Sequence, residues 1–207
     1  MKARHLTALT ALGAAAAALY QWRVKSWPCP AWFIAGLENP YFQWVAGAER
    51  LMDRASVKSG MRVLDAGCGP GRLTLPLARR VGPTGRVVAL DLQRSMLDIL
   101  ERRLAEQRLD QVEVLHAGLG DGALPEGAFD VAFLVTVLGE IPDGLAALRE
   151  IRAALRPGGL LSLTEALPDP HYQTKARVRA LAAAAGLQER ELFDGPVAYT
   201  INLWRPA

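Results

Sequence analysis

Short runs of apolar residues alternate along this chain with longer stretches in which apolar residues recur at helical spacing. The short runs predict strands, and the stretches with a period near 3.6 residues predict helices. Strands are expected over 62–65, 87–91, 112–116, 129–135 and 160–165, and helices over 41–55, 72–81, 94–108, 145–155 and 175–185. Strands that alternate with helices imply a mostly parallel sheet with helices on both faces.

The chain closes with two more strand-like runs, over 189–193 and 198–203. Only the Asp194-Gly195-Pro196 segment links them, and a parallel crossover needs a dozen or more residues. The last strand should therefore run antiparallel to its neighbour. The pattern predicts a three-layer α/β/α sandwich around a seven-stranded, mostly parallel sheet. Glycines and prolines at 82–85, 157–159 and 186 are expected to end the preceding helices.

The N-terminus differs from the rest, because residues 6–20 carry no charge and lie between the basic pairs Lys2/Arg4 and Arg23/Lys25. We expect a hydrophobic helix over 1–25 that anchors the chain to a membrane or lies in its interface; a full span needs roughly 17–25 apolar residues. A soluble helix packed on the domain and a cleaved signal peptide are the alternatives.

Aromatic residues crowd the segment that follows, which is typical of a membrane–water boundary and also of a lid over a binding site. They are Trp22, Trp27, Trp32, Phe33, Tyr41, Phe42 and Trp44. We therefore divide the chain into the N-terminal helix (1–25), an aromatic-rich linker or lid with a helix (26–59), and the α/β domain (60–207).

Composition narrows the class of protein further. The 207 residues are 51% hydrophobic, which suits one domain with a substantial core. The net charge of +3 is small and no basic stripe with interleaved aromatics occurs, so no nucleic-acid partner is expected. Cys29 and Cys68 stand far apart, which indicates neither a zinc site nor a disulfide framework, and we assign no metal. The sequence carries no signal of an oligomeric state.

The strongest chemical signal is the glycine-rich turn between the first strand and the next helix, where Gly67, Gly69 and Gly71 alternate with other residues. Glycine is needed where a backbone turns with positive φ and where a ligand lies against it. A dinucleotide site would have its third glycine at position 72, which is Arg72. Asp65 suits instead a ligand with an amino group, which S-adenosylmethionine carries on its methionine part.

Asp91 ends the second strand, 20 residues after Gly71. An acidic residue at about that offset can accept hydrogen bonds from both hydroxyls of an adenosine ribose. NAD-dependent enzymes share this feature, so Asp91 supports an adenosine group without choosing between cofactors. Its alternative role is to cap the following helix.

Four stretches of the sequence together resemble the class I S-adenosylmethionine-dependent methyltransferases. VLDAGCGPGRLT (63–74) and VVALDLQRSML (87–97) look like that family's first two motifs, and FDVAFLVTVLGEI (129–141) and LREIRAALRPGGLLSLTE (148–165) look like its fourth- and fifth-strand regions. The resemblance covers residue 60 to the C-terminus. It implies a Rossmann-like fold with an antiparallel last strand and S-adenosyl-L-methionine as cofactor.

By position, the resemblance also assigns the cofactor site. The residues around the methionine part would be Asp65, Gly67, Cys68, Gly69 and Gly71, with Asp91 on the ribose, Leu92 against the adenine, and Val135 or Thr136 beside the methyl group. The family often has an acidic residue after strand three. Here we expect Gly118 and Leu119 to hold the adenine through backbone and packing, with Asp121 as the alternative.

Methyl transfer from a sulfonium is an in-line displacement that depends mainly on alignment, and it needs a base only if the acceptor must lose a proton. Candidate bases at strand ends are Glu140, Glu165, His116, His171 and Tyr172. We rank His171 and Glu140 first as catalytic residues.

The acceptor is inferred from the N-terminus alone. A membrane-facing helix and an aromatic lid suggest a hydrophobic or lipid-like small molecule. The catalytic domain should face the cytoplasm, where the cofactor is made; a soluble cytoplasmic protein is the alternative. Two other functions stay open at this point: an NAD-linked oxidoreductase, and a non-catalytic, membrane-tethered protein that binds S-adenosylmethionine.

Overall fold

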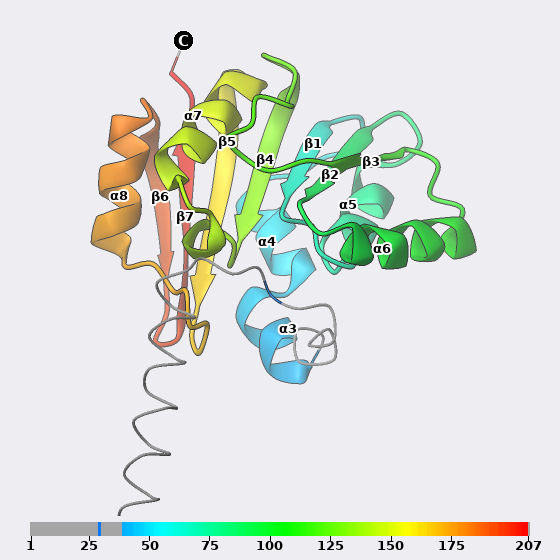
Figure 1. Cartoon of the computed structure of the whole chain (residues 1–207), viewed down its shortest axis with the longest axis horizontal. Helices are drawn as coiled ribbons and strands as arrows, with labels where there is room; N and C mark the ends of the chain where they lie inside the picture. Colours follow the sequence, from blue (N-terminus) through cyan, green and yellow to red (C-terminus); the bar gives the residue numbers. More distant parts are fainter. Residues whose placement is uncertain (1–28, 30–38, 207) are drawn as a thin grey trace, which may run out of the picture.

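The structure is a computed structural model that describes Cys29 and residues 39–206 (Figure 1). The expected N-terminal helix and most of the aromatic segment lie outside these residues, so both stay predictions. No helix within the described part is long and apolar enough to cross a bilayer.

Seven strands form one sheet, as the sequence predicts, and their order in the sheet is β3-β2-β1-β4-β5-β7-β6. They are β1 (Arg62–Ala66), β2 (Arg86–Asp91), β3 (Val112–His116), β4 (Phe129–Val135), β5 (Leu155–Ala166), β6 (Gln188–Asp194) and β7 (Ala198–Trp204). Strand β7 pairs antiparallel with both β5 and β6, and the other four pairings are parallel. The expected antiparallel last strand is therefore confirmed.

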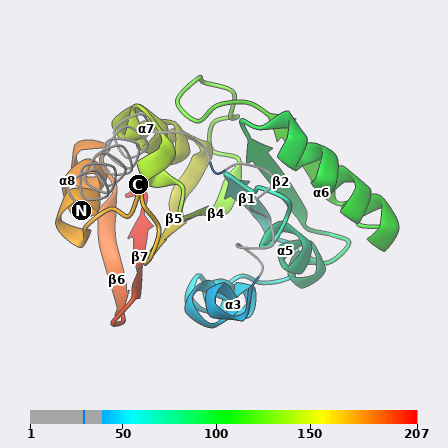
Figure 2. The same ribbon diagram turned by 60° about the horizontal axis from the view of Figure 1, so that its bottom comes forward.

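The helices cover both faces of this sheet. They are α3 (Pro40–Ala46), α4 (Ala48–Arg54), α5 (Thr74–Val81), α6 (Arg94–Gln107), α7 (Gly144–Ala154) and α8 (Lys175–Ala184), with a 3-10 turn, η2 (Leu138–Glu140). Along β2, Val87 and Ala89 face the side of α4, α5 and α6, whereas Val88 and Leu90 face α7 and α8. Figure 2 shows α7 and α8 on the side of the sheet away from α3 and α5.

Two element predictions were wrong in detail. The single helix expected over 41–55 is two helices, because Gly47 between them is extended (φ −66°, ψ 137°) and a Cβ there would overlap the carbonyl oxygen of Gln43. Strand β5 begins at Leu155 and not at 160. Gly158 and Gly159 belong to it because their backbone groups bond with Arg205, at 2.8 and 2.9 Å.

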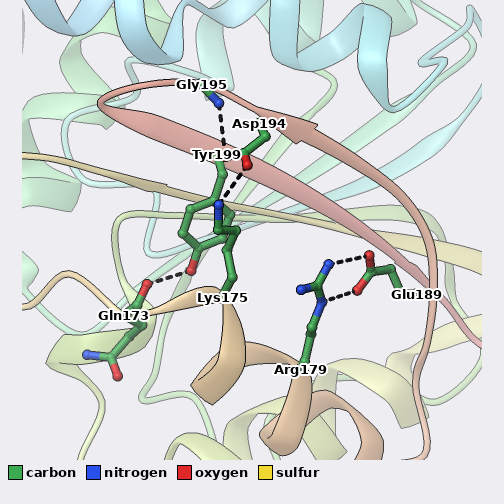
Figure 3. Close-up of polar contacts among 7 residues, drawn as sticks. All are labelled: Gln173, Lys175, Arg179, Glu189, Asp194, Gly195 and Tyr199. Atoms are coloured by element: carbon green, nitrogen blue, oxygen red, sulfur yellow. Dashed lines mark hydrogen bonds and ion pairs between the residues drawn. The ribbon is translucent and has the colours of Figure 1, made fainter.

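Polar contacts fix α8 and the loop before it against the edge of the sheet (Figure 3). Arg179 makes two hydrogen bonds with Glu189 (2.7 and 2.9 Å), and Lys175 pairs with Asp194 at 2.7 Å. Such exposed pairs add little stability. The buried Tyr199 hydroxyl donates to the carbonyl oxygen of Gln173 at 2.5 Å and thereby holds the loop that leads from β5 into α8.

Candidate active site

The glycine-rich turn follows β1 at the carboxyl end of the parallel strands, where ligands of such sheets bind. All three glycines have positive φ: +72° at Gly67, +52° at Gly69 and +92° at Gly71. A Cβ at Gly67 would meet Val137 at 2.6 Å, and one at Gly71 would meet Leu100 at 2.5 Å. A Cβ at Gly69 would meet no atom within 4 Å, so the backbone there has an open side against which a ligand can lie.

Asp65 of β1 and Cys68 of the turn itself are both buried. One carboxylate oxygen of Asp65 accepts a hydrogen bond from the Thr74 hydroxyl at 2.6 Å, and burial raises the pKa of Asp65 to about 6. Cys68 is 5% exposed and packs with α6. Both residues therefore support the turn, and a direct contact between either one and a cofactor stays a prediction.

Asp91 links the end of β2 to the turn. Its Oδ2 accepts from the Gly69 N–H and its Oδ1 from the Gln93 N–H, both at 2.8 Å. Each carboxylate oxygen can accept a second hydrogen bond. Leu92 beside it is 59% exposed although it is large and apolar. A carboxylate next to an exposed apolar side chain suits a ribose and a flat adenine ring, so these residues fit the adenosine half of the expected cofactor.

His116, one of the candidate bases, contacts the backbone beside Asp91. Its Nε2 lies 2.9 Å from the carbonyl oxygen of Leu92, and the side chain is exposed at the end of β3. The ring thus ties the end of β3 to the backbone beside Asp91, and the role of His116 as a base stays a prediction.

The loop after β3 brings Gly118 and Asp121 together, since a Cβ at Gly118 would lie 2.6 Å from Oδ2 of Asp121. Glu150 of α7 anchors this loop by accepting hydrogen bonds from the Gly120 and Leu124 amides, at 2.5 and 3.0 Å. Leu119 is partly buried against the main core. Asp121 thus lies beside Gly118, and Gly118 and Leu119, with Asp121 as the alternative, stay predicted adenine contacts.

The end of β4 has an unusual backbone conformation. Thr136 has φ +55°, which is uncommon for a residue other than glycine. Its amide donates to the Thr164 carbonyl oxygen at 2.8 Å and its hydroxyl to the Val135 carbonyl oxygen at 2.7 Å. Backbone strain of this kind clusters at functional sites, which agrees with the predicted place of Val135 and Thr136 beside the transferable methyl group.

Three carboxyl groups gather near the ends of β4 and β5: Glu140, Glu165 and Asp169. Burial raises the pKa of each, to about 8 for both glutamates. Neighbouring carboxylate charges, that of Asp169 among them, raise the pKa of Glu140 and Glu165 further, whereas the hydrogen bond from the His171 amide and the charge of His171 act to lower that of Asp169. Oε1 of Glu165 is buried without a hydrogen-bond partner in the described part of the chain, and Oε2 accepts from the Gln173 N–H at 3.1 Å. Burial thus gives this part of the site two carboxyls that titrate near neutral pH.

Sequence reasoning missed Asp169. Its Oδ1 accepts from the His171 N–H at 2.7 Å and so shapes the loop that carries the predicted base. The signal available was an acidic residue between Pro168 and Pro170, directly after β5.

His171 and Glu140 come from segments that touch. Gly139, beside Glu140 in η2, packs so closely on the backbone of His171 that a Cβ at position 139 would overlap its carbonyl oxygen. His171 is 5% exposed. A cavity of about 470 Å³ lies against the same contact, and its lining includes Leu138, Ile141, Leu181, His171, Tyr172 and Arg177.

Cys29 forms hydrogen bonds with residues at the start of α6 and in η2. Its N–H donates to Oε2 of Glu140 at 3.2 Å, and its carbonyl oxygen accepts from Nε2 of Gln93 at 2.8 Å. Burial and the charges of Glu140, Asp169 and Asp91 raise the pKa of its thiol to about 11. Through these two hydrogen bonds, Cys29 links the start of α6 to η2.

Replacing Gly139 with alanine should lower the free energy of unfolding by about 1–3 kcal/mol and turnover by at least about tenfold, because the added methyl group forces η2 away from His171. Binding of S-adenosylhomocysteine should change little. Gly144→Ala is the matched control, since a Cβ there would meet only flexible side-chain atoms, of Leu138 at 3.2 Å and of Leu181 at 3.7 Å. Denaturant unfolding measures the stability, calorimetry the binding of S-adenosylhomocysteine, and initial rates the turnover. Equal stability and turnover in the two variants would show that the close contact of Gly139 with His171 is unimportant.

The fold and the crevice define a Rossmann-like α/β protein, and comparison with known proteins takes the identification one step further. The sequence model of a family described as "Methyltransferase domain" matches residues 63–159. Residues 63–159 thus match a methyltransferase-domain family, which agrees with the resemblance to the class I S-adenosylmethionine-dependent enzymes, and family and fold together imply S-adenosyl-L-methionine as the cofactor.

Two relatives carry similar sequences. A demethylmenaquinone methyltransferase of Geobacillus sp. (strain WCH70) is 33% identical over 111 residues, which is 54% of this chain and 47% of that protein. Nocamycin O-methyltransferase of Saccharothrix syringae is 37% identical over 123 residues, 59% of this chain and 44% of that one. The chain thus spans about half the length of the curated relatives it matches.

Solved structures agree on the fold. A SAM-dependent methyltransferase from Aquifex aeolicus superposes with a TM-score of 0.79 at 23% identity, over 86% of this chain and 99% of that one. The cyclase SpnF gives a TM-score of 0.69 at 18% identity, over 77% of this chain and 80% of that one. Since a protein named as a cyclase shares the fold, the fold by itself does not specify methyl transfer.

Proposed function

We propose that this chain transfers the methyl group of S-adenosyl-L-methionine to a small hydrophobic or lipid-like acceptor. The observation that carries the proposal is the turn from Gly67 to Gly71. Its backbone is open to a ligand at Gly69, and the Gly69 N–H donates a hydrogen bond to Asp91, the predicted ribose contact. The methyltransferase-domain match over the same segment favours methyl transfer over an NAD-linked reaction.

The acceptor class rests on two observations. The 470 Å³ cavity is lined by apolar residues such as Leu138 and Ile141 and by polar residues such as Gln173, Thr174 and Arg177, so it suits a small molecule with polar groups beside an apolar part. The names of the two similar relatives refer to demethylmenaquinone and nocamycin, and we extend the idea of a small-molecule acceptor from them to this chain.

When bound, the cofactor supplies a methyl group on a positively charged sulfur. The protein's own part is to align the acceptor and to exclude water. Thr136 and Val135 would line the place of transfer, and Cys29 would help to cover it. Where the acceptor is a hydroxyl or an amine, Glu140 or His171 would take its proton; Glu140 is the better placed of the two, because its carboxylate already bonds the Cys29 amide over the crevice.

We further propose that residues 1–25 hold the enzyme at a membrane with its catalytic domain in the cytoplasm, because their apolar run has basic flanks. A chain lacking residues 1–25 should leave the membrane fraction of cells and keep its affinity for S-adenosylhomocysteine. If that truncated chain stays with membranes, the anchor lies elsewhere.

The deciding experiment has two stages. Calorimetry should show that S-adenosylhomocysteine binds and that NADH does not. Transfer of labelled methyl from the cofactor should then be measured into a membrane lipid extract and into a panel of quinone precursors, phenols and thiols. Binding without transfer into any of these would favour a non-catalytic binding protein.

A further inference from the structure

A second cavity lies at the other end of the sheet, between the end of α4 with the loop that follows it, the first residues of β4 and β5, and the strands β6 and β7. Its volume is about 230 Å³. Its charged lining residues are Arg54, Lys58, Arg156, Arg190, Asp130 and Glu191. With four cations and two carboxylates, the cavity lining has a net positive charge. The cavity has no part in the proposed methyl transfer.

The carboxylate of Asp130 is already engaged. One oxygen pairs with Arg156 at 2.5 Å, and the other accepts from the Arg62 N–H at 2.7 Å. Within Cys29 and residues 39–206, neither Lys58 nor Arg190 forms an ion pair, and the exposed Glu191 forms none with them. The cavity therefore offers positive charge that the described residues do not neutralise.

Arg54 is the most enclosed of these cations. Its guanidinium donates to the Thr200 hydroxyl at 2.8 Å and lies 4.8 Å from the centre of the Phe193 ring, but no carboxylate of the described residues pairs with it. Burial and the neighbouring charge of Arg50 lower its pKa. An anion in the cavity would offset the cost of holding this charge away from water.

Asn202 contributes a buried acceptor. The side chain is 2% exposed, lines the cavity, and donates from Nδ2 to the Arg54 carbonyl oxygen at 2.8 Å. Oδ1 has no hydrogen-bond partner within the described residues. Because a carbonyl oxygen can only accept, the amide nitrogen must face Arg54, which leaves Oδ1 for a donor in the cavity. A buried acceptor without a donor is costly, and a ligand that brings one would satisfy it.

We propose that this cavity binds a protonated oxyanion, namely hydrogen phosphate or the singly protonated phosphate monoester of a small molecule or lipid. Arg54, Lys58 and Arg190 neutralise its charge, and Asn202 accepts the hydrogen bond from its hydroxyl. Sulfate is the discriminating comparison, because it is also a tetrahedral anion but carries no proton near neutral pH.

The test is calorimetry on the full chain at pH 6, where a phosphate monoester with a second pKa near about 6 keeps much of its proton. Inorganic phosphate should bind saturably, and sulfate at least about tenfold more weakly. Arg190→Gln and Lys58→Gln should each weaken phosphate binding by about tenfold, because each removes a charge-assisted contact. Arg102→Gln, an exposed change on α6, should have no effect.

Two further arms distinguish the sources of the phosphate group. Glycerol 3-phosphate represents a soluble ligand, and phosphatidylcholine vesicles with and without phosphatidic acid represent a lipid one. Comparing Arg190→Gln with Arg102→Gln on the same vesicles separates this cavity from any binding by residues 1–25. If Arg190→Gln loses binding of glycerol 3-phosphate, the ligand is a soluble phosphate monoester. If it loses binding of the vesicles that contain phosphatidic acid, the ligand is a lipid phosphate.

The proposal is overturned if phosphate does not saturate, if sulfate binds equally well, or if both cavity variants bind phosphate like the unaltered chain. S-adenosylhomocysteine is titrated in parallel and should bind all variants alike, so a failure here is distinct from a failure of the proposed function.

Discussion

Replacing Asp91 with alanine should weaken the binding of S-adenosylhomocysteine by about a hundredfold or more. The change removes an acceptor for the ribose hydroxyls, and hydrogen bonds to a charged group are worth roughly 1.5–3 kcal/mol each. It also frees the amides of Gly69 and Gln93, which the carboxylate now holds at 2.8 Å. The loss of affinity should therefore combine a missing contact with a less ordered turn.

Two comparisons separate these causes. Asp91→Asn keeps one acceptor oxygen and the shape of the side chain, so its affinity should lie between those of the alanine variant and the unaltered chain. Asp110→Ala removes an exposed carboxylate elsewhere and should leave affinity unchanged. Calorimetry gives the affinities and denaturant unfolding reports on the fold. A folded Asp91→Ala chain that binds as tightly as the unaltered one would refute the ribose assignment.

The regular elements were predictable because their signals are local. The bounds of β3 and β4 match the predicted runs, since each is a continuous apolar or alternating segment that ends at a turn. The break at Gly47 was not predictable in this way. The apolar pattern continues through it, and the close approach of Gln43 to Gly47 appears only in three dimensions.

For the candidate site too, residues with a local sequence signal were predictable and long-range contacts were not. Asp65, the three glycines and Asp91 could be located because their spacing along the chain encodes one strand–turn–helix unit and the strand beside it. The contact of Cys29 with Glu140 joins residues 111 positions apart, and no sequence period reports it. The raised pKa values of Glu140 and Glu165 come mainly from burial, so the sequence could name both residues as candidates and rank Glu140 above Glu165, but it could not show that burial raises the pKa of both to about 8.

Turnover should rise with pH and level off above about pH 8 if Glu140 takes a proton from the acceptor. Burial raises the pKa of this carboxyl to about 8, so at pH 7 most of it is protonated and cannot act as a base. Below the pKa, the rate should fall about tenfold for each pH unit, because only the carboxylate form is active. Turnover rises with pH because Glu140 would act as a base. If it acted as a general acid with the same pKa, turnover would fall as pH rises.

Glu140→Gln should lower the maximal rate by about a hundredfold or more and abolish the dependence on pH, while binding of S-adenosylhomocysteine is kept. The shape of the side chain is preserved, and the amide oxygen can still accept from the Cys29 N–H. Glu165→Gln is the essential comparison, since that carboxyl also has a pKa raised to about 8. Loss of the pH dependence in Glu165→Gln alone would transfer the role to Glu165. Its persistence in both variants would leave alignment of the acceptor, without a buried carboxylate base, as the source of the rate.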